Sequence, residues 1–401
     1  MSDSSRLDRT LWTVVAAATL TVMAGAILGP IVPAIQDELG VSGTAAGLII
    51  TTHGGVIVLA SPLMGALVDR FGPRRPFIAG LFVYGIGGGA GLFVDSFGPL
   101  LASRVVLGLG TAAVYTAVTV LIYELYEGAA MDRALGYRSS ANSAGAAFWP
   151  LIGGAAGTMA WNLPFGVYLV AIPLGAVAVA TIPDTRAGDD PEREAESESA
   201  TLRERVAGTL AVFRDRPTLP AVYLLYFGTN ALLYAVVVFY PQLLATVDVT
   251  SSFAISLYLA ANGAAGGVSA ALYGRLITRT DRRTLVGIAF LLWVLGFGAA
   301  TLVTGPVGAV LPVVLFGLGV GLTFPSAFAW IEAFAPSDRQ GQFSSYLASA
   351  GYTGQFLSPI LFGPLIPLIG VRGVFGVAAV VAGTSAVALA IGTVRRRDGT
   401  A

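Results

Sequence analysis

Apolar residues along this chain fall into about twelve long stretches separated by short polar connections. Each stretch has roughly 20 residues, the length that a helix needs to cross the ~30 Å hydrocarbon core of a bilayer. Continuous apolar runs of this kind predict helices, because a membrane barrel shows shorter segments of alternating polarity. The predicted spans are 11–35, 45–68, 75–94, 98–124, 135–160, 163–183, 218–244, 252–276, 283–303, 307–334, 342–367 and 371–393.

Positive charge alternates along the connections between these spans. The chain has 23 arginines and no lysine, and the arginines occupy every second connection, at 6–9, 70–75, 133–138, 186–216, 275–283, 339 and 395–397. Only Arg372 lies in the other set, and Arg104 lies inside a span. By the positive-inside rule the arginine-rich side is the cytoplasm, with both termini there. The sequence therefore predicts an all-α, multi-pass protein of the plasma membrane whose surroundings are the lipid bilayer.

Composition excludes several classes of protein. Hydrophobic residues make up 55% and charged residues 11% of the chain, whereas soluble proteins have about 25% charged residues. A formal net charge of zero gives no basic field for nucleic acid. The chain has no cysteine and a single histidine, His53, so we expect no metal site and no thiol chemistry. It has no glycine-rich loop followed by lysine for ATP, so we expect no cofactor and no enzyme activity.

The first and second halves of the chain contain similar sequence motifs in the same order. A polar segment, 184–216, separates residues 1–183 from residues 217–401 and is predicted to be a solvated linker, with a regulatory docking site as the alternative. Gly108 and Gly110 recur 209 positions later as Gly317 and Gly319. Asp132-Arg133 recurs 206 positions later as Asp338-Arg339. A six-helix unit duplicated in parallel is the architecture of one large class of secondary transporters, which bind substrate between the copies.

Two motifs carry a resemblance to a known family. The connection after the second span contains Gly65, Asp69, Arg70, Gly72 and Arg74, in the order G-x-x-x-D-R-x-G-P-R-R. The fifth span contains Gly145 and Pro150, in the order G-x-x-x-W-P-x-x-G-G.

These motifs resemble signatures of the major facilitator superfamily, the second one that of its drug:proton antiporters. The resemblance implies twelve transmembrane helices in two pseudo-symmetric halves of six, with gating roles for the residues of both motifs. It also implies that Asp69 docks on the N-terminus of the eleventh span, near Gly341, where helix dipole and free N–H groups favour a carboxylate. The fifth-span motif departs from the family at Trp149, where a glycine is usual.

Four ionisable residues are candidates for proton coupling. Arg104 is deep in the fourth span, where a permanent charge needs a polar partner, and its alternative role is to reach the outer surface. The resemblance assigns an arginine at this position to proton relay. His53 titrates near neutrality, and its alternative role is a neutral hydrogen bond between helices. Glu124 and Glu332 occupy equivalent positions at the cytoplasmic ends of spans four and ten, where they are either gate carboxylates or proton carriers.

Polar and aromatic residues at mid-depth are the candidates for substrate binding. Each is either a ligand contact or a hydrogen-bonding link between helices. The candidates are Tyr115, Asn142, Tyr226, Asn230, Tyr234, Asn262, Phe324, Trp330, Tyr352 and Gln355. Amides and aromatic rings with few charges suit a small neutral or amphipathic organic molecule better than a phosphate or dicarboxylate.

The sequence therefore predicts a secondary transporter, driven by protons and acting as a monomer, that exports such a compound by alternating access. Two alternatives remain. One is a uniporter or importer of a small neutral metabolite, and the other is a membrane sensor that has retained the fold.

Overall fold

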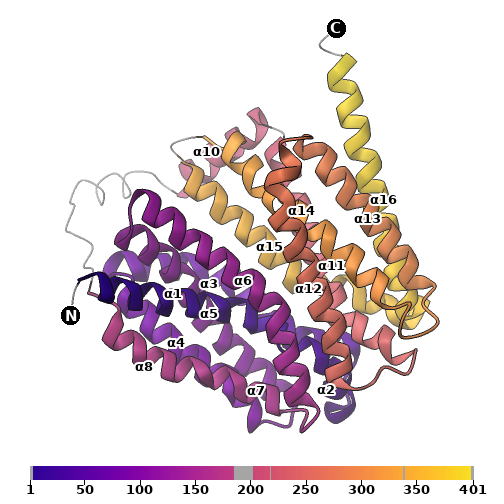
Figure 1. Cartoon of the computed structure of the whole chain (residues 1–401), viewed down its shortest axis with the longest axis horizontal. Helices are drawn as coiled ribbons and strands as arrows, with labels where there is room; N and C mark the ends of the chain where they lie inside the picture. Colours follow the sequence, from indigo (N-terminus) through magenta and orange to yellow (C-terminus); the bar gives the residue numbers. More distant parts are fainter. Residues whose placement is uncertain (1–2, 185–201, 217, 337–338, 399–401) are drawn as a thin grey trace.

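The computed structural model describes residues 3–184, 202–216, 218–336 and 339–398, and every regular element in them is a helix (Figure 1). The first part of the chain forms α1 Asp3–Ala26, α2 Val32–Leu39, α3 Gly43–Phe71, α4 Arg74–Gly89, α5 Phe97–Leu125, α6 Gly128–Gly157, α7 Leu163–Val167 and α8 Ala171–Thr181. The rest forms α10 Leu202–Asp215, α11 Thr218–Ala245, α12 Ser252–Ile277, α13 Arg282–Thr301, α14 Val310–Phe334, α15 Gln340–Phe362 and α16 Ile366–Asp398. Short 3₁₀ turns join some of these: η1 Gly29–Ile31, η2 Ala90–Leu92, η3 Tyr168–Val170 and η5 Gly363–Leu365.

Glycine and proline explain where the predicted spans are interrupted. Pro30 and Pro33 follow the end of α1, and a proline interrupts helical hydrogen bonding because it has no N–H to donate. The first predicted span is therefore divided among α1, η1 and α2. Gly370 has φ 70°, which lies in the left-handed region that favours glycine, and it divides the short start of α16 from the long helix after it.

The helices pack in two groups (Figure 1). In the first group α5 packs against α1, α3 and α4, and in the second α14 packs against α12 and α13 while α11 packs against α15. The groups meet mainly through α3 with α15 and α6 with α12. The linker residues 185–201 and Asp338 of the repeated motif lie outside the described residues. The division of the chain at 184–216 stays a prediction.

A helix forms in part of the segment expected to be a solvated linker. Within α10, Phe213 contacts the rings of Tyr223 on α11 and Phe343 on α15, with centroids 5.6 and 5.7 Å apart. Phe213 therefore anchors α10 on the second group of helices. The composition of the segment gives no sign of this helix, because the polar residues before it dominate.

Close contact between the two groups is confined to one side of the molecule. Gly154 of α6 packs so tightly against α12 that a β-carbon there would lie 2.5 Å from Ser256 Cβ. Gly47 of α3 is equally tight, 2.6 Å from Pro359 Cβ of α15. At the other ends of the same helices, a β-carbon at Gly65, Gly136, Gly274 or Gly341 would meet nothing within 4 Å. The groups therefore separate toward the arginine-rich side.

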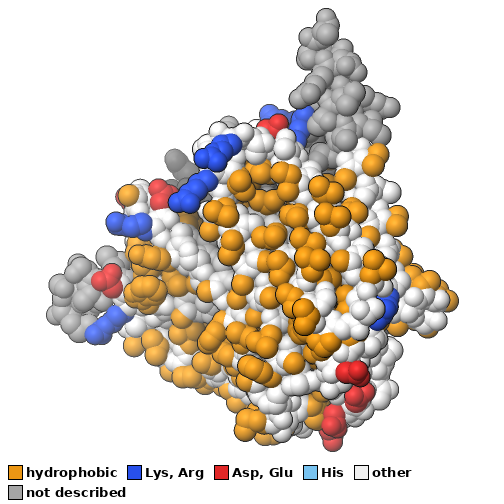
Figure 2. Space-filling model, turned by 45° about the vertical axis from the view of Figure 1, so that its right-hand side comes forward, with side chains coloured by type: hydrophobic (Ala, Val, Ile, Leu, Met, Phe, Trp, Pro, Cys, Tyr) orange, Lys and Arg blue, Asp and Glu red, His pale blue; other side chains and the backbone are white. Residues whose placement is uncertain are grey.

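The surface has the character of a membrane protein. Nine candidate spans in the described residues are long and apolar enough to cross a bilayer. Figure 2 shows apolar side chains over the middle of one face, with most of the visible arginine side chains and a few acidic ones at the upper and left edge, and a second group of acidic side chains at the lower right. Twelve crossings are consistent with this number, because one candidate, 340–388, contains both α15 and α16. In addition, two shorter or more polar helices, α4 with 16 residues and α6 with two charged residues in its first turns, occupy two further predicted spans.

Candidate functional site

Tyrosines from both groups of helices meet where α3 and α15 converge. Tyr115 of α5 and Tyr352 of α15 form an edge-to-face pair with centroids 5.7 Å apart and planes at 89°. Tyr226 of α11 packs against Phe324 of α14 with centroids 5.1 Å apart and planes at 44°. Tyr226 also lies next to Tyr352 along the chain of α15, because a β-carbon at Gly351 would lie 2.5 Å from its ring. We call Tyr115, Tyr226 and Tyr352 the tyrosine cluster.

Two amide side chains lie beside the tyrosine cluster and bind one another. Gln355 of α15 donates from Nε2 to Oδ1 of Asn230 on α11 at 3.0 Å, and Asn230 Nδ2 donates to the Tyr226 carbonyl at 2.9 Å. Gln355 Oε1 is buried and accepts no hydrogen bond within the described structure. Asn142 Oδ1, on α6, is also buried without a donor. These two oxygens are free to accept hydrogen bonds from a ligand.

The remaining predicted substrate residues separate into two kinds. Tyr234 is buried and approaches α1 so closely that a β-carbon at Gly25 would overlap its hydroxyl. Asn262 of α12 donates to the Val313 carbonyl of α14 at 3.0 Å, which is a link between helices. Trp330 is half-buried and packs against apolar side chains of the second group. The structure therefore brings together Tyr115, Tyr226, Asn230, Phe324, Tyr352 and Gln355, and places Asn262 and Trp330 in packing positions.

Arg104 is fully buried within the first group of helices. Its Nη2 donates to the carbonyls of Gly87 and Gly88 at 3.0 and 2.8 Å, at the C-terminal end of α4 where the helix dipole favours a cation. The guanidinium also stacks on the rings of Phe165 and Tyr168 at 4.9 and 5.1 Å. Nη1 has no hydrogen-bond partner in the described structure. Arg104 thus joins α4, α5 and the α7–η3 segment.

His53 is buried in α3, where α3 packs against Gly108 of α5. Its Nδ1–H donates to the Ile50 carbonyl at 2.7 Å, one turn earlier in the same helix. A β-carbon at Gly25 would approach His53 Cε1 to 3.0 Å and would also overlap Tyr234. His53 therefore lies near the junction of the two groups, and none of the hydrogen bonds described for Arg104 reaches it. Their role in proton coupling stays a prediction.

The two glutamates lie at the arginine-rich ends of their helices. Glu124 is exposed in the last turn of α5. Glu332 is exposed and lines a surface cavity of about 450 Å³ with Phe328, Gln340 and Ser344. Gln340 at the start of α15 donates to the Glu332 backbone carbonyl at 3.0 Å. This contact ties the ends of α14 and α15 within the second group.

The motif after the second span forms a tight turn between α3 and α4. Gly72, with φ 73°, takes a left-handed conformation that a residue with a β-carbon adopts only with strain. Arg74 donates to the carbonyls of Ile182 and Val179 at 2.8 Å each, at the end of α8. Asp69 and Arg70 are exposed. Asp69 has no described hydrogen bond in this arrangement, so the docking on α15 stays a prediction for another state.

The fifth-span motif lies between α1 and the second group of helices. Trp149, the departure from the family pattern, donates from Nε1 to the Thr19 carbonyl of α1 at 3.1 Å. Gly145 lies next to the Trp149 ring, so a larger residue there would displace it. Pro150 is buried inside α6, one turn before the glycines that contact α1 and α12. The motif therefore sets how closely α6 approaches its neighbours.

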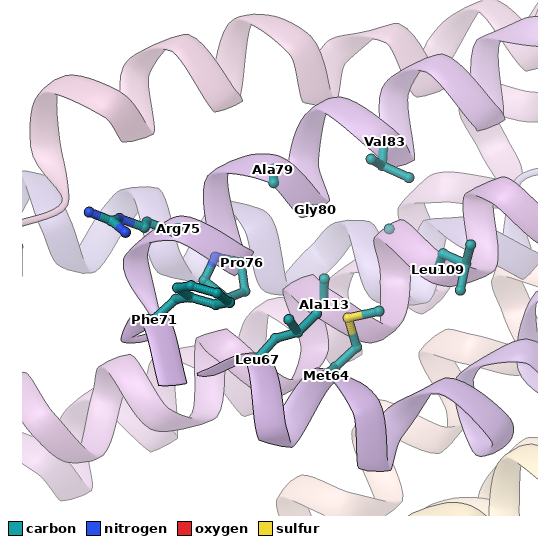
Figure 3. A pocket seen from close by; sticks show the side chains of 11 residues that line it. Met64, Leu67, Phe71, Arg75, Pro76, Ala79, Gly80, Val83, Leu109 and Ala113 are labelled. Atoms are coloured by element: carbon teal, nitrogen blue, oxygen red, sulfur yellow. The ribbon is translucent and has the colours of Figure 1, made fainter. Parts of the chain in front are cut away.

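A separate apolar groove of about 400 Å³ lies between α3, α4 and α5. Figure 3 shows its lining, with Arg75 at one end and Met64, Leu67 and Phe71 along α3. No predicted substrate residue lines it. An apolar groove within one group of helices is a poorer candidate site for a polar substrate than the tyrosine cluster between the groups.

One residue near the cluster was missed by the sequence reasoning. Arg138, grouped with the loop arginines, lies well inside α6 and stacks over the Tyr115 ring at 5.5 Å. Its position within the predicted span 135–160, four residues before Asn142, was the signal that could have identified it.

Comparison with known proteins agrees with this arrangement. The family model of the Major Facilitator Superfamily matches residues 14–250 and 222–400. Among curated proteins, the bacillibactin exporter of Bacillus subtilis (strain 168) is 29% identical over 150 residues, covering 36% of this chain and 37% of that protein. Multidrug resistance protein 1 of the same organism is 33% identical over 139 residues, covering 34% and 35%. The matched segment thus spans about a third of each relative.

Solved structures share the fold over nearly the whole chain. A variant of the nucleoside transporter NupG has a TM-score of 0.80 at 12% identity, covering 95% of this chain and 99% of that one. A bacterial homologue of the human lysosomal transporter Spinster, in an inward-facing and occupied conformation, also has a TM-score of 0.80, at 16% identity and 96% coverage of both chains. The predicted helical fold is confirmed, and this multi-pass membrane protein belongs to the Major Facilitator Superfamily.

Proposed function

We propose that this chain is a secondary active transporter that exports a small amphipathic organic compound across the plasma membrane by alternating access. The observation that carries the proposal is the one-sided contact between the helix groups, tight at Gly154 and Gly47 and open at Gly65 and Gly341, with the tyrosine cluster between them. Alternating access needs two such bodies around a fixed site at mid-membrane depth. By the positive-inside rule the open side faces the cytoplasm. In this state a compound enters from inside the cell.

Export is favoured over uptake by the functions for which similar proteins are named. The bacillibactin exporter, multidrug resistance protein 1 and quinolone resistance protein NorA of Staphylococcus aureus all match about a third of this chain. The motif around Gly145 and Pro150, typical of antiporters, supports the same direction. We propose that the protein acts as a monomer with both termini in the cytoplasm.

Proton coupling is the second part of the proposal, and one observation favours its rival, a uniporter. Glu124 and Asp132 are the only acidic residues of α5, α6, α11 and α15, which carry the tyrosine cluster and Asn142, and both lie near helix ends. The proposed proton carriers deeper in the protein are His53 of α3 and Arg104 of α5. Glu124 and Glu332 are the candidates at the cytoplasmic entrance.

Transport into proteoliposomes tests both parts. The purified protein is reconstituted with an entrapped pH-sensitive dye, and aromatic probes of positive, zero and negative charge are added under an imposed pH gradient. A proton-coupled exporter accumulates at least one probe against its gradient and moves protons in exchange, and an ionophore that dissipates the pH gradient stops both. A uniporter equilibrates the probe regardless of the ionophore. Flux no faster than in protein-free liposomes for every probe contradicts the proposal.

A further inference from the structure

Arg138 lies at the depth of the tyrosine cluster, although the pattern of arginines along the sequence assigns it to a connection between spans. Helix α6 begins at Gly128, so Arg138 lies ~15 Å along the helix at 1.5 Å per residue. Tyr115 is ~15 Å from the end of α5 on the same side, by the same count. The side chain of Arg138 is half-buried, unlike that of Arg133 one to two turns earlier, which is exposed. Arg138 is therefore not a surface arginine of the loop.

The contacts of Arg138 are aromatic. Its guanidinium lies over the Tyr115 ring at 5.5 Å. The Tyr115 ring in turn forms an edge-to-face pair with Tyr352 from the second group of helices. Within the described structure Arg138 forms no ion pair with a carboxylate. A partly buried cation that contacts only an aromatic ring is stabilised less than a cation that also forms charge-assisted hydrogen bonds with an anion. Arg138 thus has donors left for a negatively charged partner.

A hydrogen-bond acceptor lies one turn further along the same face of α6. Asn142 follows Arg138 by four residues, a spacing that places the two side chains next to each other on a helix. Asn142 Oδ1 is buried and accepts no hydrogen bond in the described structure. A buried acceptor left without a donor is unfavourable, so a ligand that brings an N–H or O–H group to it is stabilised.

We infer that Arg138 is a specificity-determining residue of the substrate site and selects an aromatic substrate that carries an anionic group. The anionic group binds the guanidinium, the aromatic part packs against Tyr115 and Tyr352, and a donor on the substrate binds Asn142 Oδ1. This inference rests on the proposed function and narrows the amphipathic substrate to an aromatic acid. Its basis is that Arg138 is half-buried, forms no ion pair with a carboxylate in the described structure, and lies over Tyr115. Tyr115 and Tyr352 join the two groups of helices.

A pair of probes of nearly the same shape tests the anionic group. Naphthalene-2-sulfonate is an anion at neutral pH and has no hydrogen-bond donor, whereas naphthalene-2-sulfonamide is neutral and has N–H donors for Asn142 Oδ1. The donors favour the sulfonamide, so a preference for the sulfonate reports the anionic group. Their affinities are measured by titration on the purified protein in detergent. The wild type is expected to bind the sulfonate about tenfold or more tightly than the sulfonamide, as one charge-assisted hydrogen bond provides.

Variants then assign the preference to a residue. Arg138→Gln is expected to lose the preference for the sulfonate while binding the sulfonamide as the wild type does. Arg138→Lys retains the charge without the planar fork and should keep part of the preference. Arg133→Gln, an exposed arginine of the same helix, is the control and should leave both affinities unchanged.

Three outcomes overturn the inference: a wild type that binds the sulfonate no more tightly than the sulfonamide, a wild type that binds neither probe, and an Arg138→Gln variant that keeps the preference. The first two do not depend on the folding of any variant. Binding is measured without transport, so charge-selective binding with no flux in proteoliposomes would contradict the proposed function alone.

Discussion

Gln355 of α15 donates a hydrogen bond from Nε2 to Oδ1 of Asn230 on α11 at 3.0 Å. This bond joins two helices of the second group and leaves Gln355 Oε1 buried without a donor, next to the tyrosine cluster. The amide pair therefore has one of the two roles that the sequence left open for Asn230, a link between helices. The unused acceptor is on Gln355, and ligand binding by either amide stays a prediction.

Replacing either amide should separate these roles. Asn230→Ala and Gln355→Ala are expected to change probe affinity while lowering the free energy of unfolding by only ~0.6 kcal/mol, the average for an interhelical hydrogen bond in a membrane protein. Ser358→Ala is the control, because Ser358 Oγ donates to the Ala231 carbonyl at 2.7 Å across the same helix pair but is fully buried. It should affect stability alone. Unchanged affinity in Asn230→Ala together with a large fall in stability would make Asn230 purely structural.

Arg104 is expected to contribute first to stability. Arg104→Ala removes hydrogen bonds from a charged donor to the carbonyls of Gly87 and Gly88, each worth about 1.5–3 kcal/mol, so the free energy of unfolding should fall by roughly 3 kcal/mol or more. Arg104→Lys should recover part of this, since it retains a charge at the end of α4. Thermal denaturation of the purified variants measures the effect.

His53→Gln is the companion variant to Arg104→Ala. It removes the titratable group and should shift the pH dependence of transport while leaving most of the stability. A stable Arg104→Ala protein that binds its probe but has lost proton-driven transport would instead show that the arginine acts in coupling.

Asp69→Asn tests the latch between α3 and α15. In the present arrangement Asp69 is exposed and the start of α15 is open at Gly341. If the carboxylate docks on the α15 N-terminus when the arginine-rich side closes, Asp69→Asn should fold and bind normally but transport much more slowly. Asp37→Asn, an exposed aspartate near the end of α2, is the control and should transport at the normal rate. Normal transport by Asp69→Asn would show that no latch exists there.

Asp281 caps the N-terminus of α13, outside the membrane-spanning segments, and makes the free energy of unfolding depend on pH. Its Oδ1 accepts a hydrogen bond from the Thr284 N–H at 2.7 Å, and this bond holds the pKa of the carboxyl below its usual value. A lowered pKa in the folded state means that the ionised carboxylate stabilises the fold. This contribution is complete above the unfolded pKa of about 3.9 and is lost as the pH falls through the folded value.

Asp281→Ala should therefore lower the free energy of unfolding by about 1 kcal/mol at neutral pH. The difference from the wild type should shrink in acid. Thermal unfolding of both proteins across this range checks the sign, with Asp95→Asn, an exposed aspartate outside any cap described here, as the reference. A difference that stays constant with pH would show that the charge of Asp281 does not stabilise the helix.

Much of the fold follows from the sequence because hydropathy alone specifies long helices in a bilayer. The apolar pattern places the start of the fifth span near 135 and not at Gly128, where α6 begins, because Asp132 and Arg133 in the first turns interrupt the apolar run that marks a span. Similarly, α10 depends on the contacts of Phe213 with α11 and α15, which no local pattern reveals.

The site was predicted less completely, because side-chain partners depend on tertiary contacts. Polarity and depth singled out Tyr115 and Tyr352, which the structure pairs, and their role in substrate binding stays a prediction. The same criteria included Asn262, whose donor is used by the Val313 carbonyl. They omitted Arg138, because the alternation of arginines along the chain assigns it to a loop. Its contact with Tyr115 depends on how α6 packs near α5.

The central claim is that the two groups of helices move about the tyrosine cluster, opening one side as the other closes. The chain has no cysteine, so pairs of spin labels can be attached at introduced cysteines without background. One pair at Arg133 and Arg279 reports on the arginine-rich ends of α6 and α12, and a second at Met159 and Ser251 reports on their opposite ends. Pulsed electron paramagnetic resonance measures both distances in lipid nanodiscs, with and without naphthalene-2-sulfonate, at neutral and acidic pH. Alternating access predicts two populations for each pair that shift in opposite directions, the first distance shortening as the second lengthens. Distances that stay the same in every condition, or that change together, would contradict the account.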